Sequence, residues 1–335
     1  MKSLKWVGII LLVLITVYFL GPQPSTPKYD LKLPAVPAEA TALGGYVLAR
    51  ESVHKLKPDN EARIIWANDS LGKKTKYSVV YLHGFSASQK EGDPVHRNFA
   101  NSFGCNLYLS RLYAHGIDTS APLAAFTAEG AWESAKEAYM IGRQLGEKVI
   151  LMATSTGGTL ALKLAAEYPD IAGLILMSPN IAINDPNAWL LNNHWGLQIA
   201  HLVTGRTREA KDTTAVYAQY WNNRYVTASL VQLEELLETT MKEKTFRKVT
   251  QPVLMLYYYK DEDHQDDVVR VSAMKRMFSQ LGTRANKKWA IAVPGAGDHV
   301  IGSSIKSADY KSVEETCNKF ASEILEMELQ TGVKK

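Results

Sequence analysis

Ser155 stands where a strand pattern runs directly into a helix pattern. The run 148–154 has the composition of a buried strand, apolar from Val149 to Ala153, and a helix pattern begins at Gly157. The residue at such a corner is forced into a strained backbone conformation, and its side chain projects above the edge of the sheet. Ala153 and Gly157 are small enough to permit the turn. Free N–H groups at the start of the helix favour an oxygen anion beside the hydroxyl, so the pattern predicts a nucleophilic serine.

A second serine has the same spacing of small neighbours. In Ala100-Asn101-Ser102-Phe103-Gly104 the serine lies at the end of a helix pattern and before a strand pattern, which reverses the required order. Gly104 is predicted to end that helix. The structural context therefore favours Ser155 over Ser102.

A serine hydroxyl needs a base to take its proton, and the base needs a carboxylate to orient it. His299 follows the last predicted strand in the short, glycine-rich stretch 295–303. Open parallel sheets collect their reactive groups past the C-terminal ends of the strands, so we expect His299 to be the base. His83 is the alternative, although its place after an early strand favours a role in orienting the adjacent loop.

The orienting carboxylate is expected in the acidic stretch 260–269, which follows another predicted strand. We expect Asp266, because Asp267-Val268-Val269 behind it would open the next helix, and Asp263 is the second choice. This stretch lacks the glycine and the terminal glutamate of a calcium loop, so no metal site is predicted. The candidates that compete for the role are Asp261, Asp263, Asp266 and Asp267.

An oxyanion needs two backbone donors, one from the residue after the nucleophile and one from a loop after an earlier strand. The first is Thr156. The second is Phe85, because Gly84 before it lets the main chain turn toward the site.

Strand patterns alternate with helix patterns along most of the chain, which is typical of a mostly parallel sheet covered by helices on both faces. Between Pro179 and Gln251 we expect no strand, only an inserted helical cap over about residues 184–250. The expected strands are 62–69, 77–85, 106–112, 148–154, 172–179, 252–259 and 287–294, and the expected helices are 94–104, 130–146, 269–282, 312–327 and the one from Gly157.

Composition is that of an ordinary globular protein of 335 residues with a formal net charge of +4. No run of lysine or arginine is longer than two residues, so nucleic acid is excluded as a partner class. Cys105 and Cys317 stand alone, without the spacing of a zinc site, and they are either buried thiols or a disulfide pair.

The first 20 residues contain an uncharged apolar run from Trp6 to Leu20 behind Lys2 and Lys5. This run predicts a membrane anchor or a signal segment, with everything downstream outside the cytoplasm. Residues 21–43 are rich in proline and are expected to form an extended linker before a domain that covers residues 44–335.

Taken together, these residues resemble the α/β-hydrolase superfamily, and within it bacterial carboxylesterases and monoacylglycerol lipases. The resemblance covers about Gly44 to Met327 and implies an α/β-hydrolase fold with a mostly parallel sheet and a helical cap. It also implies a Ser155–His299–Asp266 triad, an oxyanion hole of Phe85 and Thr156, and no cofactor. Ala153 departs from the family pattern, which has glycine there. The motifs that carry the resemblance are His83-Gly84-Phe85, 153–158, 266–269 and Asp298-His299.

The expected function is hydrolysis of a small-molecule carboxylic ester through an acyl-enzyme, with the aromatic cap shaping the acyl pocket. A serine peptidase or a thioester hydrolase would use the same triad. A binding protein that keeps the fold without catalysis would lack a member of the triad. The sequence leaves the acyl chain length and the oligomeric state open.

Overall fold

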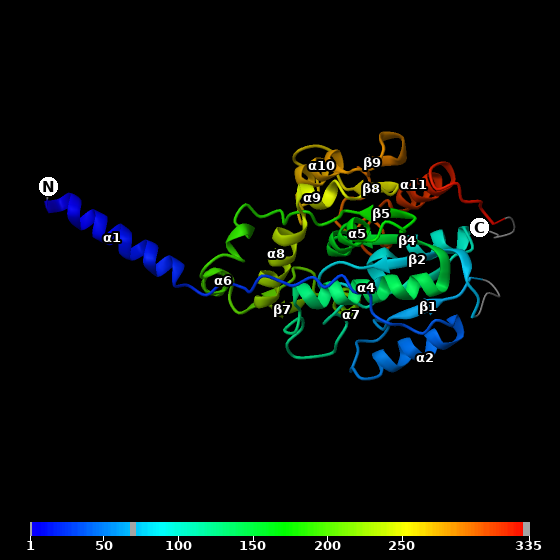
Figure 1. The fold of residues 1–335 in the computed structure, drawn as a ribbon, viewed down its shortest axis with the longest axis horizontal. Helices are drawn as coiled ribbons and strands as arrows, with labels where there is room; N and C mark the ends of the chain where they lie inside the picture. Colours follow the sequence, from blue (N-terminus) through cyan, green and yellow to red (C-terminus); the bar gives the residue numbers. More distant parts are fainter. Residues whose placement is uncertain (1, 68–71, 331–335) are drawn as a thin grey trace.

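The computed structural model describes residues 2–67 and 72–330, and its centre is a seven-stranded sheet (Figure 1). Residues 68 and 69 of the first expected strand lie outside the described residues. β1 runs antiparallel to β3, and the other neighbouring strands are parallel, which confirms the mostly parallel sheet. In sheet order the strands are β1 (Arg63–Ile65), β3 (Asn106–Leu109), β2 (Thr75–Leu82), β4 (Gly146–Thr154), β5 (Gly173–Met177), β8 (Val253–Tyr257) and β9 (Lys288–Ala292).

Alternation along the strands divides the core into two layers. In β2, Val80 and Leu82 face one layer, whereas Val79 and Tyr81 face the other, because successive side chains of a strand point to opposite faces. Both faces are therefore buried, as a sheet of parallel strands requires. The first layer contains α2 (Ala40–Glu51), α4 (Ala128–Leu145), α5 (Thr156–Glu167), α9 (Glu243–Phe246) and α10 (Val271–Gln280), and the second contains α3 (Val95–Ser102) and α11 (Tyr310–Glu323).

Cys105 and Cys317 are both free thiols, buried in the layer that contains α3 and α11. Burial raises the pKa of both thiols, so they stay protonated near neutral pH. Of the two expected states, the structure has the buried thiols.

The cap is mainly helical, but the expectation of no strand between Pro179 and Gln251 is wrong. Thr207 pairs with Val226 and Arg208 pairs with Tyr225 in a two-stranded antiparallel ribbon. Each strand has only three residues, which is too short to produce a readable alternation. The cap elements are η2 (Ala188–Leu190), α6 (Gly196–Thr204), β6 (Thr207–Glu209), α7 (Ala215–Tyr220), β7 (Arg224–Val226) and α8 (Ala228–Thr240).

The N-terminal segment forms α1 (Lys2–Phe19), which projects away from the rest of the molecule on the side of the cap (Figure 1). Its apolar side chains from Trp6 to Leu20 are exposed. Among residues 2–67 and 72–330, however, no helix is both long enough and apolar enough to cross a membrane. The expectation of a spanning anchor is therefore unsupported.

Residues 21–39 of the proline-rich segment contain no helix or strand and lie against the domain, but residues 40–43, which we expected in the linker, are the start of α2. The Trp132 indole N–H donates to the main-chain oxygen of Asp30 at 2.7 Å. The buried Lys136 ammonium donates to the main-chain oxygens of Asp30 and Lys32 at 2.7 and 2.8 Å. Both donors are on α4, so this helix fastens the segment to the domain.

Candidate active site

Ser155 lies at the corner between β4 and α5, with φ 52° and ψ −121°. A non-glycine residue in such a conformation is strained and persists only where its surroundings hold it there. The Ser155 N–H donates to Met177 O at 3.1 Å, and its carbonyl accepts from the Gly158 and Asn180 N–H groups at 2.8 and 2.9 Å. The expected strained corner is confirmed, and neighbouring segments hold it from both sides.

Gly157 is required by the close packing of α5 on the end of β2. A Cβ at this position would lie 2.0 Å from Leu82 O and 2.8 Å from His83 O, which no side chain can occupy. A Cβ at Gly158 would lie 2.6 Å from Pro179 Cβ. Both glycines therefore let the first turn of α5 approach the sheet, as the sequence pattern predicts.

The competing pattern around Ser102 is at the end of a helix. Ser102 is the last residue of α3, and Gly104 follows it with φ +60°, which is the left-handed conformation typical of a helix C-terminus. The predicted difference in context between Ser102 and Ser155 is confirmed.

His299 and Asp266 form a buried, directional pair. His299 Nδ1 lies 2.6 Å from Asp266 Oδ2. The other carboxylate oxygen, Asp266 Oδ1, accepts from the Val268 and Val269 N–H groups at 2.9 Å each. When the ring is neutral, Nδ1–H donates to the carboxylate and Nε2 carries the free lone pair; Nε2 is buried without a hydrogen-bond partner among the described residues.

Asp266 does not lie directly before a helix, which is what led us to expect it as the orienting carboxylate. We expected its carboxylate to stand just before a helix, but α10 begins only at Val271. Asp266 instead caps a short turn through the N–H groups of Val268 and Val269. Asp263, the second choice, is exposed, and the exposed Asp261 pairs with His264 at 2.7 Å.

Burial opposes charge on both members of the Asp266–His299 pair, but their attraction outweighs it. Although burial lowers the pKa of His299, the Asp266 carboxylate raises it to about 9 overall. Burial likewise raises the pKa of Asp266, yet His299 and the two N–H donors bring it below its ordinary value. The pair therefore favours the imidazolium form, which must arise when the base takes a proton.

His83 orients the loop after β2. Its Nε2 accepts the Leu112 N–H at 3.0 Å, so Nδ1 carries the proton and donates to Gly84 O at 2.8 Å. Burial holds the pKa of His83 well below its usual range, which keeps the ring neutral. This contact fixes the peptide between Gly84 and Phe85, and in a trans peptide the Phe85 N–H points opposite to the bonded carbonyl.

Phe85 and Thr156 supply backbone N–H groups without a protein acceptor in the part of the chain that the structure describes. Thr156 is the first residue of α5, where the N–H groups have no partner within the helix. Phe85 lines the same cavity as Ser155. These are the two donors predicted to bind an oxyanion.

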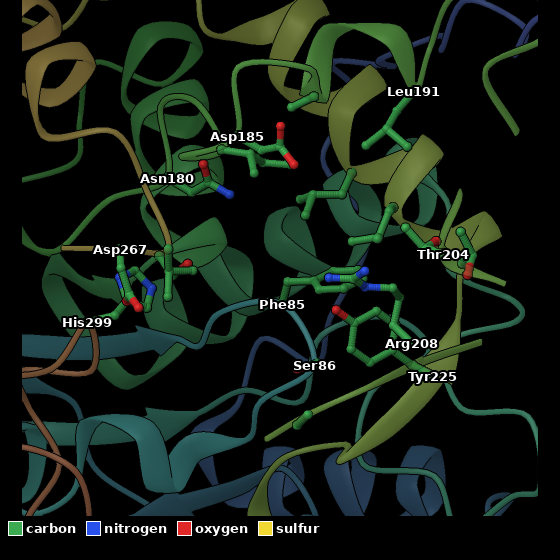
Figure 2. Close-up of a pocket in the computed structure, with 18 of the residues that line it drawn as sticks. Phe85, Ser86, Asn180, Asp185, Leu191, Thr204, Arg208, Tyr225, Asp267 and His299 are labelled. Carbon is green, nitrogen blue, oxygen red and sulfur yellow. The ribbon is translucent and has the colours of Figure 1, made fainter. Parts of the chain in front are cut away.

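A cavity of about 720 Å³ lies between the sheet edge and the cap, and Ser155, His299 and Phe85 line it. In Figure 2, His299 lies at one end of this cavity and Arg208 and Tyr225 of the cap ribbon lie toward the other, with Phe85 between them. Aliphatic side chains of the cap line it as well, namely Leu190, Leu191, Ile199, Val203, Leu230 and Leu233.

Glu91, a buried carboxyl that also lines the cavity, was not among the predicted site residues. It lies in η1 (Gln89–Gly92), and no motif or strand end in the sequence points to it. Only the folded chain brings it beside the loop that contains Gly84. Among the described residues, no group of three His, Cys, Asp or Glu side chains could hold a metal ion.

The pKa of His299 gives a test that needs no substrate. Replacing Asp266 with Asn removes the charge that favours the imidazolium, so the pKa of His299 falls from about 9 by roughly one to three pH units. Imidazole NMR signals followed from pH 5 to 11 measure the change. Asp261→Asn removes the carboxylate of the exposed Asp261–His264 pair and leaves the His299 titration unchanged. Equal titration of His299 in Asp266→Asn and the parent would contradict the assignment.

The chain is similar to known proteins in sequence and in fold. A family model described as serine aminopeptidase, S33, matches residues 131–295. A thermostable monoacylglycerol lipase of Bacillus sp. (strain H-257) is 29% identical over 186 residues, which cover 56% of this chain and 70% of the lipase.

Solved structures share the fold. One from a study of the metagenome-derived lipolytic enzymes LipS and LipT has a TM-score of 0.64 at 17% identity and covers 79% of this chain and 98% of its own. A monoacylglycerol lipase of Paleococcus ferrophilus has a TM-score of 0.54 at 16% identity, with 77% and 98% covered. Est1E of Butyrivibrio proteoclasticus, bound to ferulic acid, has a TM-score of 0.54 at 17% identity, with 79% and 95% covered. The chain has the α/β-hydrolase fold, and its sequence resembles that of a bacterial monoacylglycerol lipase.

Proposed function

We propose that this protein hydrolyses carboxylic esters through an acyl-enzyme formed on Ser155. The observation that carries the proposal is the Asp266–His299 hydrogen bond of 2.6 Å, which leaves Nε2 free beside a cavity that also contains Ser155. A base oriented in this way can take the proton of a serine hydroxyl.

The reaction proceeds in two halves. Ser155 Oγ attacks the ester carbonyl while His299 Nε2 takes the hydroxyl proton, and the carbonyl oxygen becomes an anion that the Phe85 and Thr156 N–H groups bind. The bond to the alcohol oxygen then breaks, and His299 returns the proton to the leaving alcohol. Water, activated by the same imidazole, attacks the acyl-enzyme and releases the acid and free Ser155.

The similarity to a lipase and the lining of the cavity both favour esters as substrates. The relative from Bacillus is a monoacylglycerol lipase, and one of the structural neighbours comes from a study of lipolytic enzymes. The aliphatic side chains that the cap contributes to the cavity, such as Leu191 and Leu233, suit the acyl chain of such an ester.

Replacing Ser155 tests the nucleophile. Ser155→Ala is expected to lower kcat/KM for short p-nitrophenyl esters by about 10⁴-fold or more, because the acyl-enzyme cannot form. Ser102→Ala is the matched control, since Ser102 has the same local pattern but lies at the end of α3, and it retains the parent rate. Full hydrolysis by Ser155→Ala would refute the proposed function.

A second candidate function is cleavage of an aminoacyl amide, because the matching family model is described as a serine aminopeptidase. The same triad would serve this reaction. We expect p-nitrophenyl butyrate to be hydrolysed with a kcat/KM at least about 100-fold above that of aminoacyl p-nitroanilides, a difference of roughly 2.7 kcal/mol in transition-state stabilisation. The opposite ranking in a side-by-side panel would favour the aminopeptidase.

We further propose that residues 1–20 direct the chain to a membrane, with the hydrolase domain outside the cytoplasm. The proposal is supported by the exposed apolar side chains of α1 and by Lys2 and Lys5 at its start. The full chain is expected in the membrane fraction of cells, and a chain that starts at Gly21 in the soluble fraction. Equal partitioning of the two chains would overturn this proposal.

A further inference from the structure

The cavity contains a carboxyl group that the proposed triad does not use. Glu91 is only 2% exposed, and it lines the cavity together with Ser155 and His299. Among the described residues it makes no salt bridge. Burying a carboxylate is costly, so the contacts that Glu91 makes are informative.

Glu91 contacts the loop that supplies the oxyanion donor. Its Oε2 accepts the Gly84 N–H at 2.5 Å. A Cβ at Gly84 would lie 2.8 and 2.9 Å from the two carboxyl oxygens and 2.9 Å from Ser155 Cβ. The carboxyl and the serine therefore approach the same side of Gly84, and glycine is the one residue that leaves room for both.

The Gly84 residue is held at both of its polar groups. Glu91 binds the N–H and His83 binds the carbonyl oxygen, so the following Phe85 N–H has a fixed direction. Loss of either contact frees the loop to rotate. Glu91 and His83 thus act on the oxyanion donor through Gly84 and do not touch the reacting atoms.

Glu91 also acts on His299 through its charge. Burial raises the pKa of Glu91 to about 7, although the Gly84 N–H and the positive charge of His299 favour its ionised form. In return, Glu91 is one of the carboxylates that raise the pKa of His299. Titratable and polar groups that face Glu91 are Tyr81 on β2, Tyr217 and Trp221 at α7, Asp298 and His299 after β9, and Lys90 and Asp93, which pair with each other beside it.

We propose that Glu91 is a positioning residue whose carboxylate holds the Gly84 peptide and acts on His299 through its charge across the cavity that both residues line. The inference rests on the proposed function, because it assigns Glu91 a role in that reaction. An ionised Glu91 keeps His299 protonated, and therefore idle as a base, up to a higher pH. Removing the charge lets His299 act as a base at lower pH.

The pH profile of kcat/KM for a neutral p-nitrophenyl ester tests the proposal. Glu91→Gln keeps an oxygen acceptor for the Gly84 N–H but removes the charge, so the acidic limb moves to lower pH by about one unit while the plateau stays within a few fold. Glu91→Leu removes both the charge and the acceptor, so the limb moves in the same way and the plateau falls by a further factor of ten or more, roughly.

Asp298→Asn is the matched control. Asp298 also raises the pKa of His299, but it is only half-buried and lies 3.4 Å from the Lys306 ammonium, so its charge is partly compensated. This variant is expected to move the acidic limb by less than Glu91→Gln does. An equal or larger shift of the acidic limb in Asp298→Asn would contradict the proposal, because the half-buried Asp298 would then affect His299 as strongly as the buried Glu91.

An acidic limb of Glu91→Gln that coincides with the parent's would overturn the proposal. If thermal melting shows that this variant does not fold, Glu91→Leu replaces it, because Glu91→Leu removes the same charge. That variant should also move the limb to lower pH, and an unchanged or raised limb would equally overturn the proposal. A fully active Ser155→Ala would refute the proposed function itself, whereas an inactive Ser155→Ala with unchanged Glu91 profiles would refute only the role of Glu91.

Discussion

The chemistry proposed for this protein depends on one buried hydrogen bond, between His299 Nδ1 and Asp266 Oδ2. A buried carboxylate is stable only when its oxygens have partners, and Asp266 has His299 on one oxygen and two N–H groups on the other. The two N–H groups fix the carboxylate, and the carboxylate in turn holds the imidazole in one orientation and one tautomer. The free Nε2 that results is the group on which the ester reaction depends.

The sheet makes this arrangement possible. Phe85, Ser155, Asp266 and His299 follow β2, β4, β8 and β9, which are parallel to one another through the sheet. Their C-terminal ends therefore meet at one edge, so residues far apart in the sequence gather without long loops. The cap covers this edge with mainly aliphatic side chains and encloses the space in which an acyl chain would lie.

The parallel strands, the serine and the histidine could be predicted from the sequence, because the residues that indicate each of them are neighbours in the chain. The strand 148–154 and the small residue Gly157 mark Ser155, and His299 follows the last strand. Other features arise only when distant segments meet. The β6–β7 ribbon is too short to show a period, and Glu91 and the fastening of the proline-rich segment by Lys136 depend on contacts that no spacing reveals.

The most direct test of the Ser155–His299 assignment is covalent labelling of the native protein by a fluorophosphonate, followed by mass spectrometry of its peptides. We expect one phosphonylated residue, Ser155, with labelling at least about 100-fold slower in His299→Ala because no base then takes the hydroxyl proton. Labelling of Ser155 at the same rate in His299→Ala, or labelling of a different serine in the native protein, would contradict it.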